Sequence, residues 1–309
     1  MKPQEEKSKN LLASLLGEKT LEKTSGISFS AAVILPVLLV LVFFFVGSLF
    51  GLFADGYAEK DWYKYFNFLL PQLAYALVAV FFLKYLSVGV KEFTGKPSVK
   101  YFFLAALLQF GLFSLSELNG LFLRFLEGFG YGGLKIELPS LDGFGLVGVL
   151  FVVAVLPAVF EEVLFRGIIL KGLRGFSAGA AVLLCGGLFS LFHQNPAQTA
   201  YQFCCGVCFA LLALRAESVL PTVLAHFLNN AVVILLAKFP LPALSGVWLI
   251  VAYVLSAFAL LGSLVYLIFF DKKERIKAEK KGKAEFFLCA AAGILICLIS
   301  WAINLVGGV

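Results

Sequence analysis

Residues 143–172 read GFGLVGVLFVVAVLPAVFEEVLFRGIILKG, a run that is apolar except for Glu161, Glu162, Arg166 and Lys171. A helix needs about 20 mostly apolar residues to cross the hydrocarbon core of a bilayer. The run is therefore predicted to be a membrane-spanning helix. Ionisable residues inside such a helix are costly to insert and usually mark function, so its charged residues are the first candidates for a site.

The rest of the chain has the same character. Of its 309 residues, 61% are apolar and 14% are charged, whereas soluble domains have about 45–50% apolar and about 25% charged residues. Nine segments are predicted to span the membrane: 28–53, 66–88, 101–123, 143–172, 178–195, 200–216, 218–238, 245–270 and 285–307. The fold class is thus an all-α polytopic membrane protein, a bundle of about 8–9 transmembrane helices with a polar site near the bilayer midplane.

The basic residues between these segments predict the orientation. Lys and Arg number 19 on one set of alternate loops and 5 on the other, and basic loops stay in the cytoplasm. We therefore expect a cytoplasmic N-terminus, in the plasma membrane if the source is bacterial. The net charge of +6 comes from these lysines, so the expected partner is the lipid bilayer and not nucleic acid.

The charged residues of 143–172 fall into two groups. Glu162 and Arg166 are four residues apart on one helical face and can form an ion pair. Glu161 points about 100° away from Glu162 and has no partner in its own helix. It is the carboxylate left free for chemistry, although a buried cluster that only fixes helix packing is the structural alternative.

Two histidines, His193 and His226, are the only ones in the chain, and each lies in its own apolar segment. Asn230 follows His226 by one helical turn and is expected to face the same way, whereas Asn229 is expected to point elsewhere. At 1.5 Å per residue, Glu161, His193 and His226 lie about 18, 22 and 12 Å from the cytoplasmic ends of their helices. These depths place them near the middle of the hydrocarbon core, where they can converge.

A carboxylate, two imidazoles and an amide in a dry cavity suit peptide hydrolysis without a covalent intermediate. The carboxylate takes a proton from water with help from a histidine, and His and Asn donors stabilise the oxyanion that forms. The alternative is zinc held by Glu161, His193 and His226, with water as the fourth ligand. No HExxH motif is present, and we expect no cofactor.

Three motifs resemble those of a known family. The patterns Glu161-Glu162-x-x-x-Arg166, Phe189-x-x-x-His193 and His226-x-x-x-Asn230, in this order on separate helices, look like those of the CPBP family. This family comprises the CAAX proteases and bacteriocin-processing enzymes, also called Abi proteins, and its members are regarded as intramembrane glutamic proteases.

The resemblance implies a role for each residue. Glu161 would activate water with His193 as its partner, and His226 with Asn230 would form the oxyanion site. Glu162 and Arg166 would support that geometry, and Phe189 would be a packing residue. The expected activity is an intramembrane endopeptidase that cuts a membrane-associated peptide or protein tail. A zinc-dependent version and a non-proteolytic membrane regulator or scaffold are the alternatives.

The resulting division of the chain has four parts. They are a cytoplasmic segment 1–27, N-terminal transmembrane helices 28–139, a CPBP-like catalytic core 140–240, and C-terminal helices 241–309 with a basic loop 271–283. Leucines at helical spacing in 8–23 fit either an interfacial helix or a polar tail. The ninth span exceeds the roughly eight of the family core, and the resemblance gives it no role.

Overall fold

The computed structural model describes residues 56–85, 90–133, 137–173, 176–242, 244–271 and 283–307, and their regular structure is entirely helical. Within these ranges seven helical segments are long and apolar enough to cross a membrane. They are Asp61–Phe82, Val99–Glu127, Phe144–Gly172, Pro196–Ala216, Leu220–Lys238, Gly246–Phe270 and Ala290–Gly307. A shorter apolar helix, Ala178–Phe192, is an eighth element. The predicted all-α polytopic membrane fold is confirmed.

Eight of the nine predicted spans correspond to these elements. The predicted first span (28–53), the segment 8–23 and most of the basic loop 271–283 lie outside the described residues. The second span begins earlier than predicted, at Asp61, because an aromatic-rich turn of helix precedes the apolar run. The third is longer than predicted and is divided into α5 (Val99–Leu112), η3 (Phe113–Leu115) and α6 (Ser116–Glu127).

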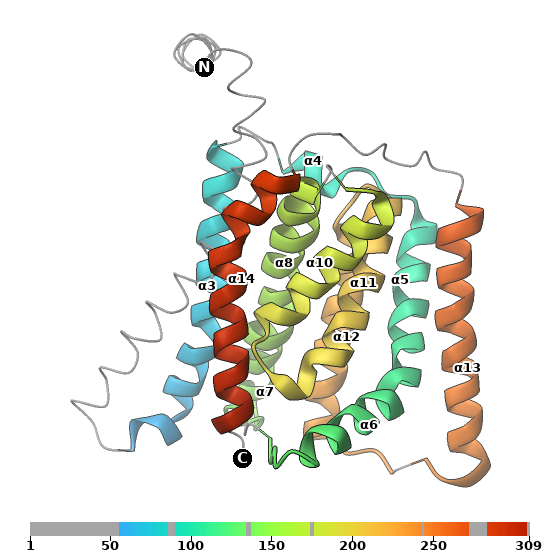
Figure 1. Cartoon of the computed structure of the whole chain (residues 1–309). Helices are drawn as coiled ribbons and strands as arrows, with labels where there is room; N and C mark the ends of the chain where they lie inside the picture. Colours follow the sequence, from blue (N-terminus) through green and yellow to red (C-terminus); the bar gives the residue numbers. More distant parts are fainter. Residues whose placement is uncertain are drawn as a thin grey trace, which may run out of the picture.

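The helices form a bundle whose centre contains the predicted functional segments (Figure 1). Its other helices are α3 (Asp61–Tyr85), α4 (Lys91–Thr94), α7 (Phe144–Val149), α8 (Leu156–Glu162), α9 (Leu170–Gly172), α10 (Ala178–Phe192), α11 (Thr199–Ala216), α12 (Leu220–Lys238), α13 (Gly246–Val265) and α14 (Lys283–Gly307). Helix α12 packs on α8 and α5, while α3 contacts α8 and α14 contacts α10. In Figure 1, α4 lies at the upper face, and α6 and the C-terminal end lie at the lower face.

Two glycines allow α10 and α11 to pack closely. A Cβ atom added to Gly186 would lie 2.8 Å from the backbone nitrogen of Val207, and one added to Gly206 would lie 2.8 Å from Gly186 Cα. Small residues let membrane helices approach to backbone contact, which strengthens van der Waals packing where no hydrophobic force is available. This contact fixes α10, which ends beside His193, against α11.

Candidate active site

The central helix is continuous over Phe144–Gly172 but is not regular. Two π-helical stretches, η4 (Leu150–Val155) and η5 (Val163–Ile169), flank the segment α8 that carries both glutamates. Pro157 lies in the first turn of α8 and has no N–H to donate to the carbonyl four residues earlier. Such π-bulges often lie at functional sites. Here the irregular backbone leaves the carbonyl of Val153 open to a side chain from another helix.

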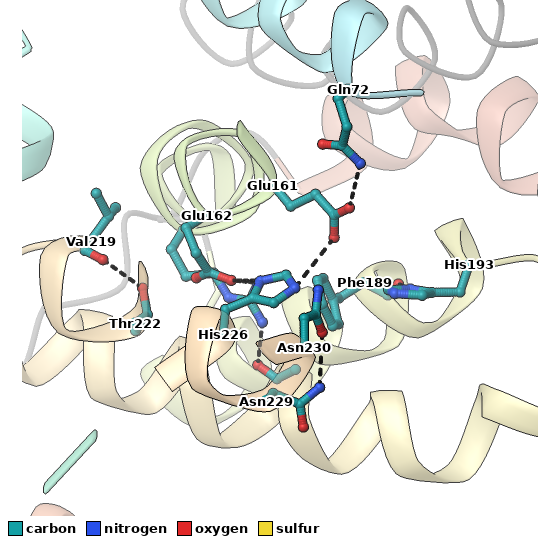
Figure 2. Close-up of polar contacts among 12 residues, drawn as sticks. Gln72, Glu161, Glu162, Phe189, His193, Val219, Thr222, His226, Asn229 and Asn230 are labelled. Atoms are coloured by element: carbon teal, nitrogen blue, oxygen red, sulfur yellow. Dashed lines mark hydrogen bonds and ion pairs between the residues drawn. The ribbon is translucent and has the colours of Figure 1, made fainter. Parts of the chain in front are cut away.

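Glu162 and Arg166 form the predicted ion pair. Arg166 Nη1 donates to Glu162 Oε1 over 2.8 Å, and both side chains have no exposed surface. The same carboxylate oxygen accepts a second hydrogen bond, 2.8 Å long, from His226 Nδ1 (Figure 2). We call Glu162, Arg166 and His226 the Glu162 cluster. It ties α8 and η5 to α12 through charge-assisted bonds, which are stronger than neutral ones.

Aromatic rings enclose the guanidinium group of Arg166. Its central carbon lies 4.2 Å from the ring centroid of Phe189 and 5.4 Å from that of Phe209, within the range of cation–π attraction. Arg166 Nη2 also donates to the carbonyl of Gly206 over 3.3 Å. Phe189 is buried and its ring lies edge-on to those of Phe165 and His226. It therefore packs between the Glu162 cluster and α10.

Glu161 faces a different environment from Glu162. Gln72 Nε2, from α3, donates to Glu161 Oε1 over 3.2 Å. His226 Nε2 lies 4.0 Å from Glu161 Oε2, so the imidazole of His226 stands between the two carboxylates (Figure 2). Glu161 is the carboxylate without a cation from its own helix, as the sequence predicted.

A cavity of about 620 Å³ adjoins Glu161. Glu161, His193, His226 and Asn230 all line it, so the convergence expected from helix depth is present. The wall also contains uncharged polar side chains from several helices: Asn67, Gln72, Tyr75, Asn119, Gln198, Tyr201, Gln202 and Asn229. Carboxylate, imidazole and amide groups thus share one cavity.

Asn230 is oriented by contacts on both of its amide atoms. Its Nδ2 donates to the carbonyl of Val153 over 2.9 Å, and its Oδ1 accepts from Asn229 Nδ2 over 3.0 Å. Asn229 Oδ1 in turn accepts from Gln109 Nε2 and from the Tyr201 hydroxyl, at 2.9 and 3.0 Å. An amide nitrogen carries two hydrogens, so Asn230 keeps one N–H for a group in the cavity.

The prediction that Asn229 points elsewhere is wrong. Asn229 lines the same cavity as Asn230 and hydrogen-bonds to it. Neighbours on a helix differ by about 100° in direction, but this cavity is wide enough to reach both, and α5 and α11 supply polar partners on the side of Asn229. A count of helical faces has no information on cavity width.

His193 lies just beyond the end of α10, at its C-cap. The helix ends there, earlier than the predicted limit of 195, because Gln194 has a left-handed φ of 51° and Pro196 cannot continue an α-helix. His193 Nδ1 hydrogen-bonds to the carbonyl of Phe189 over 2.8 Å. Since a carbonyl only accepts, Nδ1 carries the hydrogen and Nε2 remains for the cavity.

Helix α14 holds the loop that follows His193. Ser300 Oγ donates to the side-chain carbonyl of Gln194, and Asn304 Nδ2 donates to its backbone carbonyl over 2.8 Å. Trp301 Nε1 donates to Thr199 Oγ1 over 2.8 Å. The last predicted span, to which the family resemblance gave no role, therefore holds the loop that follows His193, which we call the histidine loop.

The zinc alternative requires Glu161, His193 and His226 to gather around one metal ion. Among the described residues, no group of three or more His, Cys, Asp or Glu side chains is placed to hold a metal ion. Each histidine uses its Nδ1 for a hydrogen bond within the protein, so only the two Nε2 atoms remain for a metal. These atoms and Glu161 share a cavity but are not gathered as a ligand set, so this arrangement does not fit a three-ligand zinc site.

Comparison with known proteins gives one match, to the segment that contains these residues. Residues 143–232 match the family model described as type II CAAX prenyl endopeptidase Rce1-like. This segment is therefore similar to that family. The Rce1-like family is one of proteases, which confirms the expected recognition and enzyme class. No curated protein and no solved structure matches the chain.

The Rce1-like segment contains Glu161, His193, His226 and Asn230 but not all of the site. Gln72, Gln109 and the residues of α14 that hold the histidine loop lie outside it. Sequence reasoning missed these contacts because single Gln, Ser and Asn residues are common in membrane helices. The available signal was an uncharged amide in an otherwise apolar run, as with Gln72 in α3.

Proposed function

We propose that the protein is an intramembrane glutamic endopeptidase that hydrolyses a peptide bond of a membrane-associated peptide or protein tail. One observation carries the proposal: Glu161, both histidines and Asn230 line a single cavity in a chain whose central segment is Rce1-like. Peptide hydrolysis needs a base, a proton relay and oxyanion donors. These four side chains have the chemistry for each role.

In the proposed reaction Glu161 is the base. Its carboxylate takes one proton from water, and the resulting hydroxide attacks the carbonyl carbon of the peptide bond. A tetrahedral oxyanion forms as the C=O π electrons move to oxygen. When the C–N bond breaks, the proton held by Glu161 passes to the leaving nitrogen, with His193 Nε2 as relay. The products are a carboxylic acid and an amine, which become a carboxylate and an ammonium group by proton exchange, and Glu161 is again a carboxylate.

His226 and Asn230 are proposed to stabilise the oxyanion. Asn230 has one amide N–H that Val153 does not use. Because Nδ1 of His226 donates to Glu162, its Nε2 would donate to the oxyanion from the doubly protonated ring. Removal of one oxyanion donor typically costs about 10²–10³-fold in kcat.

The proposed orientation has the N-terminus in the cytoplasm, in the plasma membrane if the protein is bacterial. The excess of Lys and Arg on alternate loops supports it. Helices α4 and α6 lie on opposite faces of the bundle (Figure 1), which agrees with basic loops that alternate between the two sides. Cysteine labelling of loops in intact cells tests this orientation independently of catalysis.

The activity is tested with purified protein in nanodiscs and a panel of quenched peptides, prenylated and unprenylated. Glu161→Gln is expected to lower kcat/KM at least about 100-fold, whereas Glu127→Gln, an exposed glutamate on α6, serves as the matched control. Wild-type activity should persist with a chelator and without bound metal.

Three results would overturn parts of the proposal. Equal cleavage by wild type and Glu161→Gln would remove Glu161 from the mechanism. Activity that a chelator abolishes and zinc restores would establish the zinc-dependent version. No product from any peptide or from membranes of producing cells, together with altered partner capture by Glu161→Gln, would favour the regulator or scaffold.

A further inference from the structure

Gln72 links the proposed catalytic carboxylate to an unused hydrogen-bond acceptor. Gln72 lies in α3, is 6% exposed and lines the cavity. Its amide nitrogen donates to Glu161 over 3.2 Å (Figure 2). An ionised carboxylate can only accept, so the nitrogen and not the oxygen of the amide must face Glu161. The carbonyl oxygen of Gln72 is thereby turned away from Glu161.

That carbonyl oxygen has no partner. Gln72 Oε1 is buried and accepts no hydrogen bond from the described part of the chain. Asn119 Oδ1, on the α6 part of the cavity wall, is also buried without a donor. A buried acceptor left unsatisfied is destabilising, and nearly all such groups in native proteins have partners. Two of them in one cavity indicate that a bound molecule brings the donors.

The required donors are N–H groups, and a peptide main chain carries one on almost every residue. Resting on the proposed function, we propose that Gln72 Oε1 and Asn119 Oδ1 bind backbone N–H groups of the substrate peptide beside the scissile bond. This site recognises the main chain and not a particular side chain. Gln72 then has two functions, since it also fixes one oxygen of Glu161 and leaves the other toward His226.

The arrangement has a consequence for the substrate. A helical peptide has its N–H groups occupied internally, so only an unwound segment can offer them to Gln72 and Asn119. In hydrocarbon, a peptide that unwinds needs replacement acceptors for its N–H groups. The amide oxygens of the cavity wall meet that need at the place where cleavage is proposed. The substrate class is therefore an extended peptide segment drawn from a membrane-associated tail.

The test combines enzyme variants with backbone-modified substrates. For a peptide that wild-type enzyme cleaves, each amide near but not at the scissile bond is replaced in turn by an ester, which removes one N–H. At one position the ester is expected to lower wild-type kcat/KM about tenfold, the effect of one hydrogen bond to a buried acceptor. In Gln72→Leu the same ester should change kcat/KM less than about twofold, because no acceptor remains to be left unpaired.

Matched variants separate binding from positioning. Asn119→Leu should abolish the ester effect at a second position and leave the first unchanged. Gln202→Leu removes a cavity-lining amide without a buried, unpaired oxygen and should leave the whole ester profile as in wild type. Gln72→Met provides a second substitution of similar size, and thermal unfolding of each variant establishes that the bundle is folded.

The outcomes distinguish this inference from the proposed function. If esters cost wild type and Gln72→Leu the same at every position, Gln72 does not bind the backbone and acts only on Glu161. If Gln72→Leu and Gln72→Met cleave all substrates like wild type, Gln72 has neither function. If cleavage does not depend on Glu161 at all, the proposed mechanism fails, whatever the ester profile.

Discussion

Glu161 and Glu162 are neighbours in α8, yet they lie in opposite surroundings. Glu162 is fully buried, pairs with Arg166 and His226, and does not line the cavity. The side chain of Glu161 is 11% exposed, lines the cavity, and is held by a neutral amide from another helix. The Glu162 cluster is thus closed off from the cavity, whereas Glu161 faces it. We call these the closed side and the open side.

The difference shows how one segment can carry one carboxylate inside a buried ion pair and another that faces a cavity. A charge in a membrane is tolerated when a partner neutralises it, and Glu162 has such a partner four residues away. Glu161 has only hydrogen-bond donors and a histidine at 4.0 Å. This difference supports Glu161, and not Glu162, as the base of the proposed mechanism.

The largest expected effect is a loss of stability when the charge of Glu162 is removed. Glu162→Gln leaves the Arg166 guanidinium buried without a carboxylate. Removing one partner of a buried ion pair typically costs about 3–5 kcal/mol of stability. Glu161→Gln should abolish cleavage and cost less than about 1 kcal/mol, because no buried cation loses its partner. Denaturant or thermal unfolding in detergent, beside peptide cleavage, measures both.

A double variant sharpens this prediction. Glu162→Gln with Arg166→Met removes both charges and should recover part of the lost stability without recovering activity, because a neutral amide oxygen is a weaker acceptor for His226 Nδ1 than the carboxylate. Equal destabilisation by the single variants of Glu161 and Glu162 would contradict the distinction between an open and a closed side.

Sequence reasoning predicted the closed side better than the open side. Helical spacing alone gives the Glu162–Arg166 pair, since i,i+4 geometry is local. Apolar run lengths give the spans, because the bilayer fixes helix length. Gln72 and the α14 contacts depend on which distant helices become neighbours, and no periodicity records that. The end of α10 at Phe192 was also missed, because the left-handed Gln194 is fastened by α14 and not by its local sequence.

The next largest effect concerns the support of the open side by α14. Asn304→Asp keeps the size of the side chain but removes the N–H donated to Gln194. We expect about a tenfold loss of kcat with little change in KM, because a loosened His193 affects proton transfer more than binding. Single-turnover and steady-state kinetics measure this split.

Trp301→Phe is the comparison for Asn304→Asp. It removes a hydrogen bond from the same helix to Thr199, farther from His193 along the chain, and should lower kcat less than Asn304→Asp. If both variants lose stability and leave kcat unchanged, α14 only packs against the bundle and does not position the histidine.

A smaller effect is expected where the irregular helix meets Asn230. Pro157→Ala returns a backbone N–H that can donate to the carbonyl of Val153 and compete with Asn230 Nδ2. The helix should gain stability, while the freed Asn230 amide should lower kcat about 3–10-fold through a poorer oxyanion site. Stability should therefore rise while kcat falls. Parallel losses of stability and activity would show that Pro157 acts through packing instead.

The smallest effect is expected at an ion pair outside both regions. Asp142, just before α7, accepts from Lys238 at the end of α12, and this lysine lowers the pKa of the Asp142 carboxyl below its ordinary value of 3.8. A lowered folded-state pKa stabilises the protein at pH values above the unfolded-state pKa, and this contribution is lost as the pH falls through the folded-state value. Asp142→Asn should therefore lower Tm slightly at pH 7 and leave it unchanged in strong acid. The shift should shrink in high salt, because the carboxylate is exposed and screened. The buried Glu162–Arg166 pair should respond little to the same salt, so a Glu162→Gln effect that fades equally would show that the Glu162 cluster is not closed to solvent.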